Sequence, residues 1–406
     1  MEALVLALFL IFSCTTISLT GGGRPDADYQ LRWVLVASDL LLGLVVLTQL
    51  PHLRALWGSR SRHRCALGAV ALTVSLLPAL ALHPSARGGA AVLRWIGVAM
   101  IAFAVGRLAG PARSLVLGTF AGVTVLQVVV ALAQRVGDGP VGLDSLGEAR
   151  AHEIGGRYAS TGLTVHPYVL AAWCVLGAAI LIAAVACAQG RGNFGLAVAA
   201  VMPFAGVGLT MSRAGALGLV LVLVSLGVAA LGRPALRTVL AGAVVATGVG
   251  VALDLSGWQN RASSTSGRSV ATVTSGRLDL LDQAWGLFRD DPVFGVGPGR
   301  YVEVLVDRPD LVKLATQRPS RPVHVTPYLV VVEGGLVALP ALLFLGWAVV
   351  TQSWRAGAPG VGVALSIVPF MLLDHLNWSY PQGLLLTGLW LGTLDHFGHR
   401  GTGKAS

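Results

Sequence analysis

The feature that most constrains this chain is a series of long apolar stretches that recur along most of its 406 residues. Each stretch is about 17–24 residues long, which is enough for a helix to cross the hydrocarbon core of a bilayer. Hydrophobic residues make up 54% of the sequence and charged residues only 12%, which leaves too little polar surface to cover a soluble domain. Spanning segments must satisfy their own backbone hydrogen bonds. The sequence therefore predicts an all-α polytopic membrane protein.

We expect about twelve transmembrane helices and a long extracytoplasmic loop that contains an amphipathic helix. Residues 1–255 are predicted to hold helices one to nine, residues 256–326 the loop, and residues 327–406 helices ten to twelve with a short cytoplasmic tail. The predicted spans are roughly 3–20, 31–50, 65–82, 91–110, 115–134, 165–187, 194–210, 214–232, 238–255, 327–350, 360–375 and 383–397.

The distribution of arginine predicts the orientation, because short cytoplasmic loops carry an excess of basic residues. The connector PHLRALWGSRSRHR, between predicted helices two and three, contains four arginines. Placing this connector in the cytoplasm also places both chain termini there. Residues 135–164 and 256–326 then lie outside, so we expect a multi-pass protein of the cytoplasmic membrane with an extracytoplasmic active site.

Within the long loop, the stretch at about 275–290 has the periodicity of an amphipathic helix. Arg277 falls on its apolar side and is predicted to face the bundle rather than water. The predicted helix lies on the mouth of the bundle. Its apolar face is predicted to consist of Leu278, Leu281, Ala284, Trp285 and Phe288.

Ionisable side chains gather at the predicted outer ends of the spans, where such groups are costly and usually functional. The orientation follows from arginines in other parts of the chain, and it places all of these side chains on the same side of the membrane. This agreement independently supports one extracytoplasmic site. Asp39 and Glu333, inside predicted spans, are expected to form structural pairs. The residues at the outer ends are Arg157, His166, Arg213, Arg277, His324, Asp374 and His375.

These residue types suit a reaction on a diphosphate. Arginine stays charged and binds phosphate oxygens through two N–H groups at once, so two or three convergent arginines can hold a diphosphate without a metal. A neutral histidine nearby can accept a proton from an attacking hydroxyl. No spacing of histidines and carboxylates matches a metal site. Together these residues would serve a glycosyl transfer in which the leaving group is a lipid diphosphate.

The order of the motifs resembles a known family. Arg213 in MSRAG, Arg277 leading GRLDLLDQAW, the loop DPVFGVGPGRY and His324 before PYLVVVEGG follow GRYASTGLTVHP. This combination resembles the O-antigen ligase and O-antigen polymerase superfamily of bacterial membrane glycosyltransferases over about residues 90–395. Arg268 competes with Arg277 for the loop role, and the helix position favours Arg277.

The resemblance implies an inverting, metal-independent transfer of a glycan from a polyprenyl (undecaprenyl-type) diphosphate carrier to a glycan or glycolipid acceptor. It implies no cofactor and no nucleic acid partner. Carried onto this chain, Arg213 and Arg277 would hold the diphosphate, and His324 would activate or orient the acceptor hydroxyl. The predicted substrate-binding set also includes Arg157, His166 and Tyr301.

Other classes stay open at this point. A flippase for lipid-linked sugars would place its charges in a central cavity and show internal repeats. A peptidoglycan-type polymerase of the shape-and-division class would carry an acidic catalytic residue in the long loop. The clustering of arginine and histidine at one face favours transfer, but the choice between ligase and polymerase stays open.

The segment RDDPVFGVGPGRY, at residues 289–301, resembles a phosphate-binding loop. A dinucleotide loop follows a buried strand and opens a helix, whereas here an amphipathic helix comes first. Pro298 also removes an amide that a phosphate would need. We predict instead that the glycines turn the chain sharply and return Phe294 and Tyr301 to the bundle.

Overall fold

The computed structural model describes residues 1–13, 36–149, 152–154, 156–187, 194–231, 233–263, 277–311 and 322–402. Arg268 lies outside these ranges. The regular structure within them is helical, apart from a hairpin of two short antiparallel strands. The elements are α1 (Glu2–Ser13), α2 (Ala37–Gln49), η1 (Leu50–His52), α3 (Leu53–Gly58), α4 (Arg64–Ser75), α5 (Leu77–Leu82), α6 (Ala86–Arg107), α7 (Gly110–Val136), η2 (Asp144–Leu146), β1 (Glu153–Ile154), β2 (Arg157–Tyr158), α8 (Pro167–Cys187), α9 (Phe194–Leu209), α10 (Arg213–Ala230), α11 (Pro234–Ala252), α12 (Leu255–Ser263), α14 (Arg277–Asp290), α15 (Tyr301–Val306), α16 (Thr326–Arg355), α17 (Gly357–Leu373), α18 (Leu376–Ser379) and α19 (Pro381–Thr402).

The helices confirm an all-α polytopic membrane protein. Among the described residues, seven helices are long and apolar enough to cross a membrane, or eight if the bent pair α11–α12 forms one span. Every predicted span overlaps a helix. However, α1, α9 and α17 have 12, 16 and 17 residues, fewer than the roughly 20 that a straight crossing needs. The count of twelve therefore stays a prediction.

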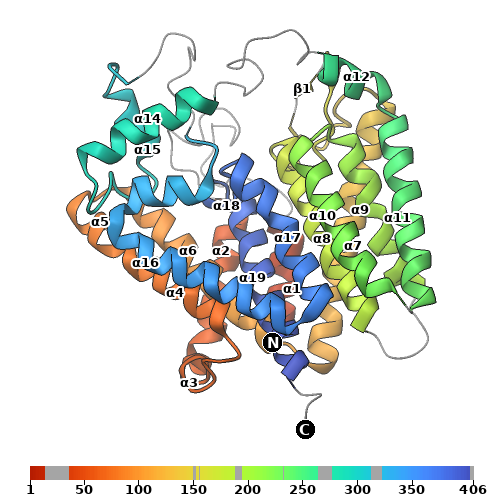
Figure 1. Cartoon of the computed structure of the whole chain (residues 1–406), viewed down its shortest axis with the longest axis horizontal. Coiled ribbons are helices and arrows are strands. Elements are labelled where there is room, and N and C mark those ends of the chain that lie inside the picture. Colours follow the sequence, from red (N-terminus) through yellow and green to blue (C-terminus); the bar gives the residue numbers. More distant parts are fainter. Residues whose placement is uncertain are drawn as a thin grey trace.

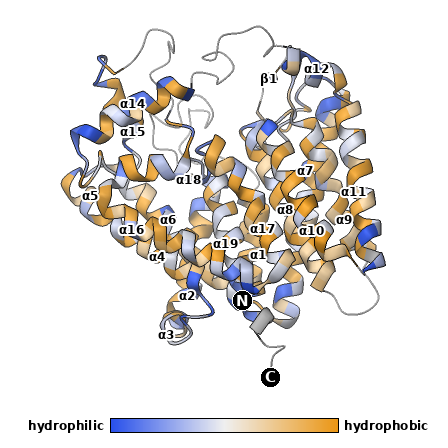
Figure 2. Cartoon of the chain, in the orientation of Figure 1, coloured by the Kyte–Doolittle hydropathy of each residue, from blue (hydrophilic) through white to orange (hydrophobic). Residues whose placement is uncertain are grey.

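The molecule has two distinct ends. Figure 1 shows both chain termini and α3 at one end, and α12, β1 and α14 at the opposite end. Hydrophobic residues dominate the lengths of the helices between these ends, while hydrophilic residues are frequent in α12, in α14 and in the segment beside α3 (Figure 2). This distribution is the one expected when the middle of the bundle lies in hydrocarbon and the ends lie in water.

The core of the bundle is built around α8. In its most apolar 18-residue window, 89% of the residues are buried, which fits a helix that is apolar on all sides. It packs against α7, α9, α10, α17 and α19. Its largest side chain, Trp173, is fully buried and donates its indole N–H to the hydroxyl of Thr124 at 3.1 Å.

One predicted structural pair is present as an ion pair. Asp39, at the start of α2, accepts hydrogen bonds from Arg94 of α6 at 3.0 and 2.7 Å. Both side chains are 13% exposed. Because a bidentate pair of this kind compensates the cost of burying each charge, it fixes α2 against α6.

A break in α16 receives the glycine-rich loop that follows α14. Gly335 has φ +66° and ψ −170°, so the helix is interrupted there. Buried backbone N–H and C=O groups that lose their helical hydrogen bonds at such a break need other partners. The glycine-rich loop supplies these partners. Four backbone hydrogen bonds of 2.9–3.2 Å join the two segments: Val296 N to Val332 O, Gly297 N to Glu333 O, Leu336 N to Pro292 O, and Val337 N to Val293 O.

The loop glycines make this contact possible. Gly295, Gly297 and Gly299 have φ values of +70°, +96° and +68°, which confirms that they turn the chain. At Gly295 the requirement is also steric, because a Cβ atom there would lie 2.5 Å from the carbonyl oxygen of Val332. The backbones of the loop and of α16 therefore touch directly.

Replacing Gly295 by alanine is expected to lower the thermal unfolding midpoint of the protein in detergent. Alanine must adopt φ +70°, a strain of about 1–3 kcal/mol, and its Cβ must also push α16 away. Gly346→Ala is the matched control, because Gly346 lies in the same helix with nothing within 4 Å of the added Cβ. Equal midpoints for the two variants would show that the loop is not seated on the break.

Candidate active site

Several residues of the predicted site lie at the start of α14, just before α16 and just after α17, namely Arg277, His324, Asp374 and His375. Helix α14 covers Arg277–Asp290 and packs against α16. It ends directly before Asp291-Pro292, since proline cannot continue a helix. The same loop that docks on α16 therefore fixes the position of α14.

The buried face of α14 differs from the predicted one. Leu280, Gln283, Ala284 and Leu287 are buried, whereas Trp285, predicted to be buried, is 51% exposed. The physical reason is that α14 lies between two neighbours. It packs on α16, and a second side of the helix contacts the segment that includes α15. On that second side, a Cβ on Gly286 would touch Leu311, and the carbonyl of Leu280 accepts a hydrogen bond from the hydroxyl of Tyr301. A helical wheel with one apolar face misses the second contact.

Because a different face of α14 is buried, some of its apolar side chains are partly exposed. Leu278 is 51% exposed, like Trp285. Leu281 and Phe288 are half-buried, and the Phe288 ring stacks on that of Trp285 at 5.5 Å. The helix thus presents an apolar flank to its surroundings.

Arg277, the first residue of α14, reaches the end of α17. Its Nη2 donates to the carbonyl oxygen of Leu373, the last residue of that helix, at 3.0 Å. Carbonyls at a helix C-terminus lack intrahelical partners and attract cations. The Nε of Arg277 is buried and has no hydrogen-bond partner among the described residues. The guanidinium is therefore anchored at one nitrogen and has further donors for an anion.

Two histidines lie beside this contact. The ring centroids of His324 and His375 are 5.1 Å apart, and the ring of Tyr380 stacks on His375 at 5.6 Å. Thr326, in the first turn of α16, donates its hydroxyl to the backbone carbonyl of Asp374 at 2.9 Å. The start of α16 is thereby held against the residue that follows α17.

The carboxylate of Asp374 lies at the centre of the group. It accepts hydrogen bonds from the amides of His375 and Leu376 at 2.7 and 3.1 Å. The side chain of Asp374 is buried, and Arg277 and His324 are among its electrostatic neighbours. The buried carboxylate therefore lies in the electrostatic environment shared by Arg277 and His324.

Arg213 is the exposed first residue of α10. The chain enters this helix through a tight turn in which Met211 has φ +50°. Ser212 caps the helix by accepting a hydrogen bond from the amide of Gly215 at 3.1 Å. The local sequence thus leaves the arginine side chain directed to the surface, at a positively polarised helix end.

The packing of α10 against α17 places Arg213 at the same end as Arg277. A Cβ on Gly218 would contact the backbone of Ser366, and one on Gly362 would contact Leu226. The two helices are therefore antiparallel, and the start of α10 lies level with the end of α17, where Arg277 is bound.

Arg157, in β2, contacts the start of α12 rather than α14. Arg157 donates to the hydroxyl of Ser256 at 2.7 Å and lies 3.8 Å from Asp138 and 4.0 Å from Asp254. These carboxylates neutralise part of its charge. The structure thus places Arg157 in a network of its own rather than beside Arg277.

His166 directly precedes α8. Its Nδ1 accepts the amide N–H of Tyr168 at 3.1 Å, and its ring packs edge-on against His152 at 4.4 Å. Val165, one residue earlier, donates its amide to Gln382 at the start of α19. His166 therefore belongs to the junction between α8 and α19.

Tyr301 is 1% exposed, as expected for a residue that the loop returns to the bundle. Its hydroxyl donates to the backbone carbonyl of Leu280 at 3.5 Å, which joins α15 to α14. Tyr301 therefore packs inside the protein, and its side chain is not accessible to a substrate in this structure.

Glu333 is the residue whose importance the sequence does not reveal. It is 3% exposed and accepts the amides of Gly299 at 2.7 Å and Tyr301 at 3.3 Å, together with the indole N–H of Trp378 at 2.7 Å. One carboxylate thus joins the glycine-rich loop, α16 and α18. It was expected in a structural pair, but its partners are uncharged N–H groups. A carboxylate in the sequence VVEGG, directly before a break, was the only available signal.

Residues 197–343 match the sequence model of a family described as O-antigen ligase. The match covers Arg213, Arg277, His324 and Glu333, and it confirms the resemblance to the O-antigen ligase superfamily. No curated protein shows a significant sequence match to the chain. The match covers about a third of the chain and, together with the apolar helices, indicates a multi-pass membrane enzyme of the O-antigen ligase type that acts in polysaccharide synthesis. The family implies a lipid-linked glycan and a glycan acceptor as substrates.

Replacing Glu333 by alanine is expected to destabilise the protein strongly. Three buried donors lose their acceptor, and each unsatisfied buried group costs about 1–3 kcal/mol. Glu333→Gln should cost less, because the amide keeps one acceptor oxygen. The control is Glu303→Ala, since this side chain is 43% exposed and pairs with Arg300 at 3.3 Å, a contact worth about 0–1 kcal/mol. Thermal unfolding in detergent tests the order, and a Glu333→Ala midpoint no lower than that of Glu303→Ala would contradict it.

Proposed function

We propose that this protein transfers a glycan from a polyprenyl diphosphate carrier to an acceptor sugar at the outer face of the cytoplasmic membrane, as a ligase or polymerase of a cell-surface polysaccharide. The transfer inverts the anomeric configuration and uses no metal. The observation that carries the proposal is the anchoring of Arg277 on the carbonyl oxygen of Leu373, the residue directly before the buried Asp374.

The diphosphate is assigned to Arg277 and Arg213. Both lie at the end of the bundle opposite the chain termini, and that end is taken as extracytoplasmic from the arginine distribution. Arginine N–H groups match the spacing of phosphate oxygens, and the charge that develops on the leaving diphosphate is stabilised in a site prearranged to receive it. Arg157 and His166 then border the acceptor side rather than the diphosphate.

The chemical step assigned to this group is a single displacement. The acceptor hydroxyl oxygen forms a bond to the anomeric carbon, and the bond between that carbon and the phosphate oxygen breaks. The hydroxyl proton passes to His324, and polyprenyl diphosphate leaves with the bonding electrons. Asp374 stabilises the positive charge that His324 then carries. The products are the extended glycan and the carrier diphosphate.

Arg277→Lys is expected to lower transfer in proteoliposomes about 100-fold, the order found when one preorganised donor to a developing charge is lost. Lysine keeps the positive charge but lacks the planar guanidinium group. It therefore cannot hydrogen-bond the Leu373 carbonyl and a phosphate oxygen at the same time in the geometry of arginine. Arg289→Lys is the matched control, because Arg289 is exposed on the same helix, and it should retain full activity. Equal activity of the two variants would remove Arg277 from the site.

His324→Ala is expected to lower the rate by about 100- to 10,000-fold, the range associated with loss of a general base. The variant should still bind the donor, since the arginines remain. Donor binding and turnover should therefore be measured separately, in proteoliposomes and by release of polyprenyl diphosphate. A fall in binding alone, with normal turnover at saturation, would contradict the assignment of His324.

Release of polyprenyl diphosphate also separates transfer from transport. A flippase moves the lipid-linked glycan without breaking the glycosidic bond, so it releases none. We expect release that depends on the acceptor. Donor movement across the bilayer without any release would overturn the proposed reaction.

A further inference from the structure

A pocket lies at the end of the bundle opposite the candidate active site. Its walls come from α1, α6, α7, α8 and α19. The space that atoms leave empty is about 530 Å³, including the part open to the surface. Leu108, Leu117 and His396 of its lining are half-buried, so the pocket is reached from outside the bundle.

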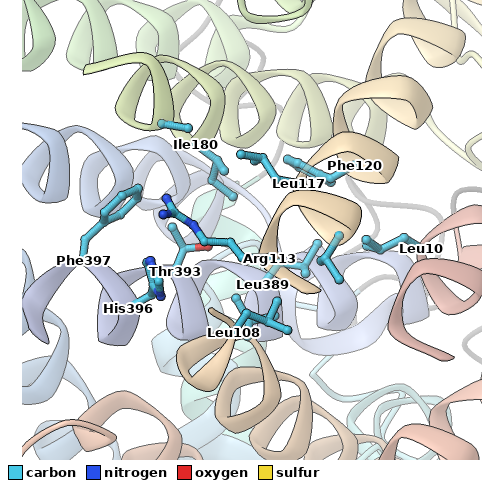
Figure 3. Close-up of a pocket in the computed structure, with 13 residues that line it drawn as sticks. Leu10, Leu108, Arg113, Leu117, Phe120, Ile180, Leu389, Thr393, His396 and Phe397 are labelled. Atoms are coloured by element: carbon cyan, nitrogen blue, oxygen red, sulfur yellow. The ribbon is translucent and has the colours of Figure 1, made fainter. Parts of the chain in front are cut away.

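The pocket is polar at one end and apolar along the rest. Figure 3 shows Arg113 extending toward Thr393, with His396 and Phe397 beside them. The Arg113 guanidinium lies 6.0 Å from the centre of the Phe397 ring. The remaining wall is hydrophobic and includes Leu10, Leu117, Phe120, Ile180 and Leu389.

The polar end lies where the bundle leaves the hydrocarbon. Arg113 is in the first turn of α7, and His396 is in the last two turns of α19. Phe120, seven residues after Arg113, is about 10 Å deeper along α7 at 1.5 Å per residue. The pocket is thus an amphipathic slot whose polar mouth faces the headgroup region and whose apolar part faces the acyl region.

We propose that this slot binds an anionic phospholipid, with one acyl chain along the apolar wall and the phosphate at Arg113 and His396. Water is a poor occupant of a slot with so few polar groups, whereas the bilayer supplies acyl chains directly. The charge is complementary, because this end of the molecule also carries the exposed arginines Arg54 and Arg60. Basic pockets between transmembrane helices are suited to anionic headgroups.

The site is independent of the proposed reaction, since none of its residues belongs to the candidate active site. Its consequence is structural: a lipid in the slot would contact α1, α7, α8 and α19 together. The occupant therefore acts as an additional packing element between the first helix and the last.

The test uses the purified full chain in detergent, stripped of lipid and titrated with phosphatidylglycerol or phosphatidylcholine, with native mass spectrometry to count bound lipid. Phosphatidylglycerol should bind about fivefold more tightly than phosphatidylcholine, as expected for one basic contact. Arg113→Gln should abolish that preference. Arg54→Gln, which removes an exposed charge at the same end, should leave it unchanged.

A second variant tests the apolar part. Ala184→Leu fills the slot from α8 and should weaken both lipids, while the elution profile shows whether the variant is folded. The proposal is overturned if wild type does not discriminate between the lipids, or if Arg113→Gln keeps the preference. It is also overturned if a polyprenyl phosphate displaces phosphatidylglycerol at lower concentration, since the occupant would then be a carrier lipid.

Discussion

The candidate site depends on one constraint: a buried break in a helix must have its backbone hydrogen bonds completed by another segment. The loop 292–297 completes those of α16, and Glu333 binds the next turn of the loop together with Trp378. Arg277, His324 and the end of α17 are then held by segments that meet at this junction. Without the junction, α14 would be joined to the bundle only through side chains and the single contact of Arg277 with Leu373.

The fold class could be predicted because it depends on a property of the chain alone, namely apolar length relative to bilayer thickness. The glycine turns were predictable for the same reason, since positive φ is a local requirement. The buried face of α14 was not, because it depends on two neighbours distant in sequence. The role of Glu333 in joining three segments could not be predicted from the sequence. Its hydrogen-bond partners are backbone amides 32 and 34 residues away and an indole 45 residues away.

The site residues divide in the same way. Motif order selects Arg277 and His324 as candidates, and both act electrostatically on the buried Asp374. Arg157 could not be separated from them by sequence, because its carboxylate and hydroxyl partners lie at the end of α7 and at the bend between α11 and α12. The two ends of the bundle also differ chemically. One end holds the exposed Arg213 and the anchored Arg277 of the proposed diphosphate site, and the other holds an apolar slot with a basic mouth.

The break at Gly335 has a consequence for how the protein folds. Helix α16 cannot complete its hydrogen bonds on its own, because the partners for the break are supplied by the loop that follows α14. The native hydrogen bonding of α16 therefore requires that the preceding loop be folded against it. A change that prevents the loop from docking would leave buried backbone groups of this helix without partners.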